Sequence, residues 1–289
     1  MVFALTVISA LVVAFGEVVQ QRWAAQAPAQ YNLSPRLLWW LVRQPRWLVG
    51  VGISFGGNAV FTAALSTGGV VLIEAVFVVR LVFALLIAAV WGRHRVPLRE
   101  AFGAVAITAG LVAFLLAGHP EQGDVSGVPD LRWMVGGGGI VAVAAVLSVI
   151  GARSRPVPKA ALLGAGTGVL YGVQGPLMQT AIRTATAVGV LALAVSWSGY
   201  AVIVVAVLGM LFVQSAFGAA SLEASYPAVV TGQLLSAIAV GTGVLGGRLR
   251  LDPVSLAVFV PALVLMVAGI YLLSSSPIVT GTRAAAGHH

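Results

Sequence analysis

The sequence predicts an all-α membrane protein of about nine transmembrane helices, arranged as two inverted structural repeats. Hydrophobic residues make up 60% of the 289 residues and charged residues only 8%, whereas soluble domains carry about 25% charged residues. The apolar residues also fall into runs that match the roughly 20 residues needed to cross a bilayer as a helix. Short motifs that recur at a nearly constant spacing predict the repeats.

Nine apolar runs follow one another along the chain. Their approximate limits are 2–20, 47–67, 69–91, 100–118, 133–151, 160–181, 188–213, 223–247 and 254–273. The first run has no basic flank before it, so we expect a retained helix and not a cleaved signal peptide. Arginines flank the piece 37–42, which is too short to cross and should lie in the interface or re-enter the membrane. The run 188–213 is longer than one crossing, so it should tilt or begin with a short piece of the same kind.

Three short matches relate the two ends of the chain. They pair Phe15-Gly16 with Tyr171-Gly172 at an offset of 156, Gly92-Arg93 with Gly247-Arg248 at 155, and Ala109-Gly110 with Ala268-Gly269 at 159. Four apolar runs lie in each half, and the fifth joins the halves and reverses the second. Inverted repeats of this kind are typical of alternating-access carriers.

The matches divide the chain into four parts. Residues 1–118 form the first transmembrane repeat, 119–157 an acidic external loop and a linker helix, and 158–276 the second repeat. Residues 277–289 form a cytoplasmic tail, and its two final histidines fit the remnant of an expression tag.

Basic residues predict how the chain crosses the plasma membrane. One set of alternate loops, with the C-terminal tail, holds eleven arginines and lysines, and the opposite set holds four. Basic loops stay in the cytoplasm, so the N-terminus should lie outside and the C-terminus inside. The acidic loop 119–130 should then face outward as a solvated connection. Arginines in short loops also explain the net charge of +8 without a nucleic-acid partner.

Three charged residues lie inside apolar runs: Glu17, Glu74 and Arg80. A charge at the bilayer centre costs about 2.5–3.5 kcal/mol on insertion scales, so such residues are usually functional. They indicate a pathway for a solute or an ion, and the alternative is an ion pair that only locks helices together. Glu74 and Arg80 lie about 120° apart around a helix, so they need not pair. An unpaired arginine would bind carboxylate or phosphate and repel a bare cation.

Polar and small residues within the runs complete the predicted site. Candidates for a central cavity are Asn58, Gln174, Tyr226 and Gln233, although such side chains also bind helices to one another. Glycines at 136–139 and at 164, 168 and 172 predict close helix contacts. The prolines at 176 and 227 predict breaks that free backbone groups.

The segments FGEVVQQRWAA, LVRQPRWLVGVGISFGGNAVFTAALSTGGVVLIEAV and MLFVQSAFGAASLEASYPAVV resemble the drug/metabolite transporter (EamA-like) superfamily. Within it, the chain is similar to the nine-helix branch that holds the NIPA-type magnesium transporters and many actinobacterial members. The chain departs from that pattern at Glu74-Ala75, where relatives often carry Gln-Pro, and at Thr231-Gly232, where they often carry Asp-Pro. Glu17 resembles the glutamate that exchanges protons in the small multidrug resistance branch.

Three classes of function stay open, and no cofactor is expected for any of them. The first is a secondary transporter of a small polar or anionic solute, with proton coupling through Glu17 as one version. The second is a NIPA-like divalent cation transporter. The third is a non-transporting membrane subunit or lipid-intermediate translocator, whose partner would be lipid, a second copy or another membrane protein. An enzyme is not expected, because the sequence has no cysteine and lacks His-Glu-x-x-His and Gly-x-Ser-x-Gly motifs.

Overall fold

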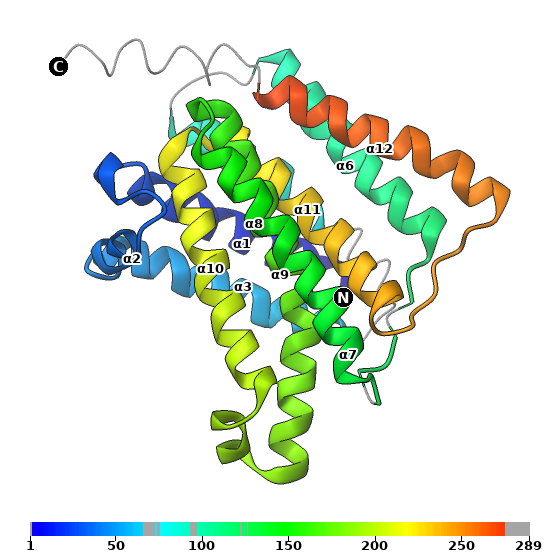
Figure 1. Ribbon diagram of the computed structural model, residues 1–289. Coiled ribbons are helices and arrows are strands. Elements are labelled where there is room, and N and C mark those ends of the chain that lie inside the picture. Colours follow the sequence, from blue (N-terminus) through cyan, green and yellow to red (C-terminus); the bar gives the residue numbers. More distant parts are fainter. Residues whose placement is uncertain are drawn as a thin grey trace.

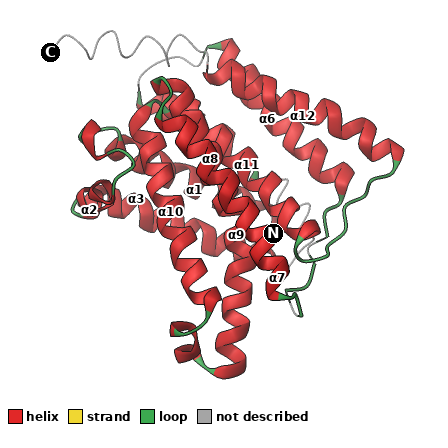
Figure 2. Cartoon of the chain, in the orientation of Figure 1, coloured by secondary structure: helices red, strands yellow, loops and turns green. Residues whose placement is uncertain are grey.

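The computed structural model describes residues 2–65, 73, 76–92, 97–121, 123–125 and 127–274. Within these ranges, the regular structure is helical apart from one isolated bridge between Glu121 and Arg248. Figure 2 shows that the longer loops lie between α6 (Leu98–Gly118) and α7 (Asp130–Arg132) and between α11 (Leu222–Gly243) and α12 (Pro253–Ser274). The protein is therefore all-α, as the composition predicts.

Seven helices are long and apolar enough to cross a membrane. They are α1 (Val2–Ala24), α3 (Pro45–Leu65), α6 (Leu98–Gly118), the run from α7 (Asp130–Arg132) through η2 (Trp133–Gly137) to α8 (Gly138–Ala152), α10 (Trp197–Ala219), α11 (Leu222–Gly243) and α12 (Pro253–Ser274). Two further helices, α5 (Arg80–Trp91) and α9 (Pro156–Val188), cover the remaining predicted runs. Length and composition thus support a multi-span membrane protein.

The third predicted run, 69–91, is not a uniform helix in the part that the structure describes. The helix α5 has only 12 residues and begins at Arg80. Just before it, the backbone N–H of Val79 donates to the carbonyl of Val76, and that of Leu81 donates to Val78. These hydrogen bonds join residues three apart, whereas those of an α-helix join residues four apart, so the turn is tighter than an α-helical one. The chain therefore changes geometry at the residue that carries the charge.

The helix α9 runs unbroken for 33 residues and contains Pro176. The predicted break at this proline is wrong. Proline removes its own N–H donor, and a surrounding helix can absorb that loss. Pro227 likewise lies inside α11 without ending it.

Two short elements precede α3 and α10. The helix α2 (Pro35–Val42) begins at the cap Ser34, whose hydroxyl accepts from the N–H of Arg36. A short 3₁₀ helix, η3 (Val190–Ala194), precedes α10, which is capped by Ser196. The prediction of a short piece at the start of the run 188–213 is therefore confirmed. Another 3₁₀ turn, η1 (Ala29–Tyr31), lies before α2.

Long helices pack in pairs (Figure 1). The helix α1 packs on α3, α9 packs on both α10 and α11, and α6 lies beside α12 along one edge of the molecule. Gly103 lies against Gly269, and Gly118 lies against Phe259, so α6 and α12 are antiparallel. A shared core of apolar side chains, including Leu81 of α5, joins α1, α5, α6, α10, α11 and α12.

Glycines set the closest of these contacts. Gly164, Gly168 and Gly172 of α9 meet the α11 residues Ser225, Val229 and Ser236, as their spacing predicts. The glycine run 136–139 behaves differently. Gly136 contacts Val244, but Gly138 and Gly139 face open space, so the prediction of close contact is wrong for these two.

The acidic loop is more firmly anchored than a solvated connection would be. Glu121 pairs through its backbone with Arg248, and Asp124 forms an ion pair with Arg183 at 3.2 Å. Asp252, at the start of α12, accepts backbone N–H groups from Val254 and Ser255. The Ser255 N–H and hydroxyl lower the pKa of this exposed carboxyl. Acidic groups thus accompany arginines at this end of the bundle.

Candidate functional site

Arg80 joins the third predicted span to the eighth. Its Nη2 donates to Oε1 of Gln233 on α11 at 2.9 Å. Its guanidinium also lies 4.6 Å from the centre of the Phe77 ring, a favourable cation–π arrangement. Both contacts are to neutral groups, so neither cancels the charge of the arginine.

A small cavity of about 120 Å³ lies beside this arginine. Its polar lining comes from Asn58 of α3, Arg80 of α5 and Gln233 of α11. The other lining residues are Phe61, Phe77, Val78, Leu115, Val230, Leu234 and Ala237. An apolar wall with a few polar groups that converge on one space is the usual form of a small-molecule site.

Glu17 lies on α1 and is partly buried. Its carboxylate interacts electrostatically with Arg80. Within the ranges that the structure describes, however, no carboxylate oxygen lies within 4.0 Å of the Arg80 guanidinium. An ion pair that only locks helices is therefore not formed between Glu17 and Arg80.

Two tyrosines lie within electrostatic range of Glu17. The hydroxyl of Tyr226 on α11 is buried and has no hydrogen-bond partner in the described part of the chain. It also interacts with Arg80. Tyr171 of α9 interacts with Glu17 in the same way. A buried hydroxyl without a partner is costly, but Tyr226 is not among the residues that line the cavity.

The predicted site residues thus fall into three groups. The structure brings Asn58, Arg80 and Gln233 together around one cavity, with Tyr226 and Glu17 in electrostatic range of Arg80. Gln174 is partly buried on α9 but does not line this cavity. Glu74 lies outside the described residues.

Sequence reasoning missed Tyr171 and, although Gln214 stands out as a polar residue inside an apolar run, the contacts that Gln214 makes. Tyr171 carries no signal beyond its place beside Gly172 in the repeat match. A second polar cluster, which we call the glutamine cluster, consists of Gln20, Trp47, Ser54 and Gln214. Gln214 is fully buried and Gln20 is 4% exposed. Both are uncharged and lie within or beside apolar runs, so the sequence distinguishes them poorly from other amides.

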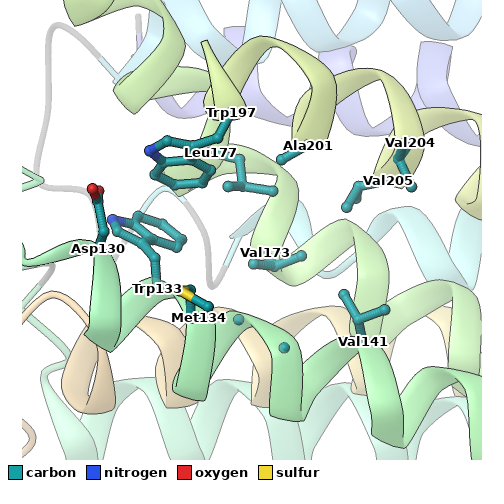
Figure 3. A pocket seen from close by; sticks show the side chains of 12 residues that line it. Asp130, Trp133, Met134, Val141, Val173, Leu177, Trp197, Ala201, Val204 and Val205 are labelled. Atoms are coloured by element: carbon teal, nitrogen blue, oxygen red, sulfur yellow. The ribbon is translucent and has the colours of Figure 1, made fainter.

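The larger cavities are apolar grooves away from Arg80. One, of about 430 Å³, lies between α8, α9 and α10 (Figure 3). Trp133 and Trp197 face each other at one end, with Asp130 beyond them. A second groove, of about 490 Å³, is lined mostly by α8, α9 and α11. Neither groove contains a charged group suited to hold a polar solute at depth.

Comparison with known proteins gives no named function. No protein-family model matches the chain, and no solved structure matches it. The chain is similar to an uncharacterized protein of Corynebacterium glutamicum, with 29% identity over 280 residues that cover 95% of each chain. The similarity extends over nearly the whole length of both proteins.

Proposed function

We propose that the protein is a secondary membrane transporter that moves a small polar or anionic solute by alternating access. The observation that carries the proposal is Arg80, a charged residue that lines a cavity between apolar helices and whose contacts in the described part of the chain, with Gln233 and the Phe77 ring, are to neutral groups. A charge at this depth is costly and is kept where it serves a pathway. A lock between helices would need a carboxylate partner, and among the residues that the structure describes the guanidinium bonds to an amide.

The chemistry of Arg80 favours an anion over a metal cation. A guanidinium carries five N–H donors in a planar fork, and Gln233 accepts from one of its nitrogens. The fork matches a carboxylate or phosphate. A bare divalent cation would be repelled from the same space, which argues against a NIPA-like magnesium transporter. The inner volume of about 120 Å³ fits a solute of a few heavy atoms.

Contacts between α6 and α12 are consistent with the inverted repeat, which requires these two helices to be antiparallel. A Cβ at Gly103 would lie 3.0 Å from the Gly269 carbonyl, and one at Gly110 would lie 2.7 Å from the Ala262 carbonyl. At the offset of 159 in the motif match, the first contact maps onto the second. The contact of Gly269 with Ile107 maps in the same way onto the contact of Gly110 with Met266.

The remaining helices support the same relation. The packing of α1 on α3 has its counterpart in the packing of α9 on α10. The short helix α2 before α3 has its counterpart in η3 before α10. Two halves related in this way would place Arg80 and Gln233 at the surface where they meet, which is the usual position of a carrier's substrate site.

The third class of function, a subunit or lipid translocator, receives mixed support. The apolar grooves on either side of α8 suit lipid chains. The centre of the bundle is nevertheless not collapsed, because a polar cavity remains at Arg80. We therefore place solute transport ahead of lipid translocation.

We further propose that the N-terminus lies outside the plasma membrane and the C-terminus in the cytoplasm. The arginines at positions 183, 248 and 250 are accompanied by Asp124, the Glu121 backbone and Asp252, so the proposed outer end carries little net positive charge. Single cysteines at Ser126 and Ser154, in a chain without native cysteine, test this orientation in intact cells. An impermeant thiol reagent should label position 126 and not position 154. The reverse pattern contradicts the orientation.

Uptake by reconstituted vesicles tests transport itself and its coupling. We expect wild-type protein to accumulate a labelled carboxylate or phosphate from a panel of small anions when a proton gradient is imposed. Glu17→Gln removes the titratable group while leaving an amide of nearly the same shape, so accumulation driven by the gradient should be lost while exchange without a gradient remains. Gradient-driven accumulation by Glu17→Gln at the wild-type level would remove Glu17 from the coupling step.

A further inference from the structure

The glutamine cluster ties the first half of the chain to the second. Nε2 of Gln214 on α10 donates to Oε1 of Gln20 on α1 at 3.0 Å, and Nε1 of Trp47 on α3 donates to Oε1 of Gln214 at 3.1 Å. Nε2 of Gln20 also donates to the Ser54 hydroxyl at 3.0 Å. Gln20, Trp47 and Gln214 are all buried. Buried amide bonds of this kind hold one arrangement of helices, because separating them leaves polar groups unpaired.

A second tie lies at the same end of the bundle. Nδ2 of Asn32 donates to the Ser215 carbonyl, and the Leu33 N–H donates to the Ser215 hydroxyl, both at 3.0 Å. The end of α1 also approaches α10 closely, since a Cβ at Gly218 would lie 3.1 Å from the Ala24 carbonyl. The ends of α1 and α10 are therefore closed against each other.

The repeat relation predicts what an equivalent closure would be at the opposite end. Helix α1 corresponds to α9 and α3 to α10, so the contact of α1 with α10 has its image in a contact of α9 with α3. At an offset of 155 to 156, Gln20 maps to Gly175 or Pro176, and Gln214 maps to Ala59 or Asn58. An equivalent closure would bring Gly175 or Pro176 of α9 against Asn58 or Ala59 of α3.

The structure does not show that second closure. The Asn58 amide donates within its own helix, to the Ser54 carbonyl at 2.8 Å, and the residue lines the cavity beside Arg80. Gly175 faces open space, with no atom within 4 Å of the position of a Cβ. One end of the bundle is thus closed, where α1 packs against α10. The other end is open, between α3 and α9.

We propose that the glutamine cluster is a gate of the transporter, closed in this structure, and that its opening is accompanied by closure of α3 on α9 near Asn58 and Gly175. This inference rests on the proposed function, because it assigns the two ends of the bundle to the two access states. In the proposed orientation, the cluster lies on the cytoplasmic side and the structure is the outward-facing state. Opening at one end and closing at the other exposes the cavity to each side in turn.

Cross-linking tests the gate directly, because the chain has no native cysteine. One double variant, Ala24→Cys with Gly218→Cys, reports the closed gate. Another, Ala59→Cys with Gly175→Cys, reports the opposite closure. A short bifunctional thiol reagent is applied to protein in lipid nanodiscs, and the yield of linked peptides is measured by mass spectrometry.

Each pair is then combined with Gln214→Ala, or with Gln20→Ala as a second variant in case the first does not fold. We expect the 59–175 yield to rise by about fivefold and the 24–218 yield to fall, because losing one or two hydrogen bonds shifts a two-state equilibrium by about that factor. The matched control is Ser236→Ala, which removes a bond to the Val169 carbonyl inside one half of the chain. It should leave both yields unchanged.

The outcomes separate the gate from the transport proposal. If neither glutamine variant changes the 59–175 yield, or if Ser236→Ala changes it equally, the cluster is not a gate, whatever the vesicles accumulate. If the two yields change in opposite directions but vesicles take up no anion, the coupled opening and closing of the two ends is retained and the transport proposal alone fails.

Discussion

Replacing Arg80 with lysine is expected to lower anion uptake by about 10- to 100-fold while the protein stays folded. An ammonium group keeps the positive charge but loses the planar fork that binds two oxygens of one carboxylate or phosphate. A hydrogen bond to a charged group is worth about 1.5–3 kcal/mol, which corresponds to that range of affinity. Uptake by reconstituted vesicles, at anion concentrations below saturation, measures the loss.

The matched control is Arg43→Lys, the same change at an arginine stacked on Trp39 outside the cavity. It should retain wild-type uptake. Arg80→Ala separates binding from a structural role. Its neighbour in the structure is the Gln233 amide, so removing the guanidinium should cost about 1–3 kcal/mol of stability, less than the 3–5 kcal/mol that follows the breaking of a buried ion pair. Wild-type uptake by a stable Arg80→Ala protein would refute the binding proposal.

Gly168→Ala is expected to have the largest effect on stability. A methyl group there would collide with the Val229 carbonyl on α11 and lie 2.7 Å from the Gln233 backbone nitrogen. Backbone atoms cannot move aside as a flexible side chain can, so α9 and α11 must separate, at a cost of about 1–3 kcal/mol for overpacking. The shift also moves Gln233 and with it the partner of Arg80. Thermal unfolding in detergent measures the stability, and vesicle uptake measures the site.

The control for this variant is Gly139→Ala on α8, where the added methyl group would meet open space. Alanine favours the helix by about 0.5–1 kcal/mol over glycine, so this variant should unfold at or above the wild-type temperature. If Gly168→Ala is as stable as Gly139→Ala, the close packing of α9 on α11 is not as described.

Much of the fold was predictable because the membrane-spanning helices of a protein differ in composition from the segments between them. Runs of apolar residues gave the all-α class, the positions of the helices and the short pieces at α2 and η3. Helix ends were less predictable. The helix α9 continues to Val188 through polar threonines whose hydroxyls bond to carbonyls within the helix, and hydropathy carries no signal for such bonds.

The partners within the site were not predictable from one sequence. Arg80 is conspicuous in its apolar run, but the bond to Gln233 joins residues 153 positions apart, and no local pattern specifies such a distance. The turn at Val78 and Val79 has no local signal, since valine itself does not break a helix. Gln20 and Gln214 are uncharged, so nothing in their own segments distinguishes a bond between halves from one within a half.

The central claim is that Arg80 forms an anion site at the meeting surface of the two halves. The most direct measurement is the thermal stability of purified wild-type and Arg80→Gln proteins against small monocarboxylates, dicarboxylates, inorganic phosphate and magnesium chloride. A ligand at 100 times its dissociation constant stabilises the folded state by about 2.7 kcal/mol. We predict that at least one anion raises the unfolding temperature of the wild-type protein by several degrees and leaves Arg80→Gln unchanged. Equal stabilisation of both proteins by magnesium, with no anion acting through Arg80, would contradict the claim.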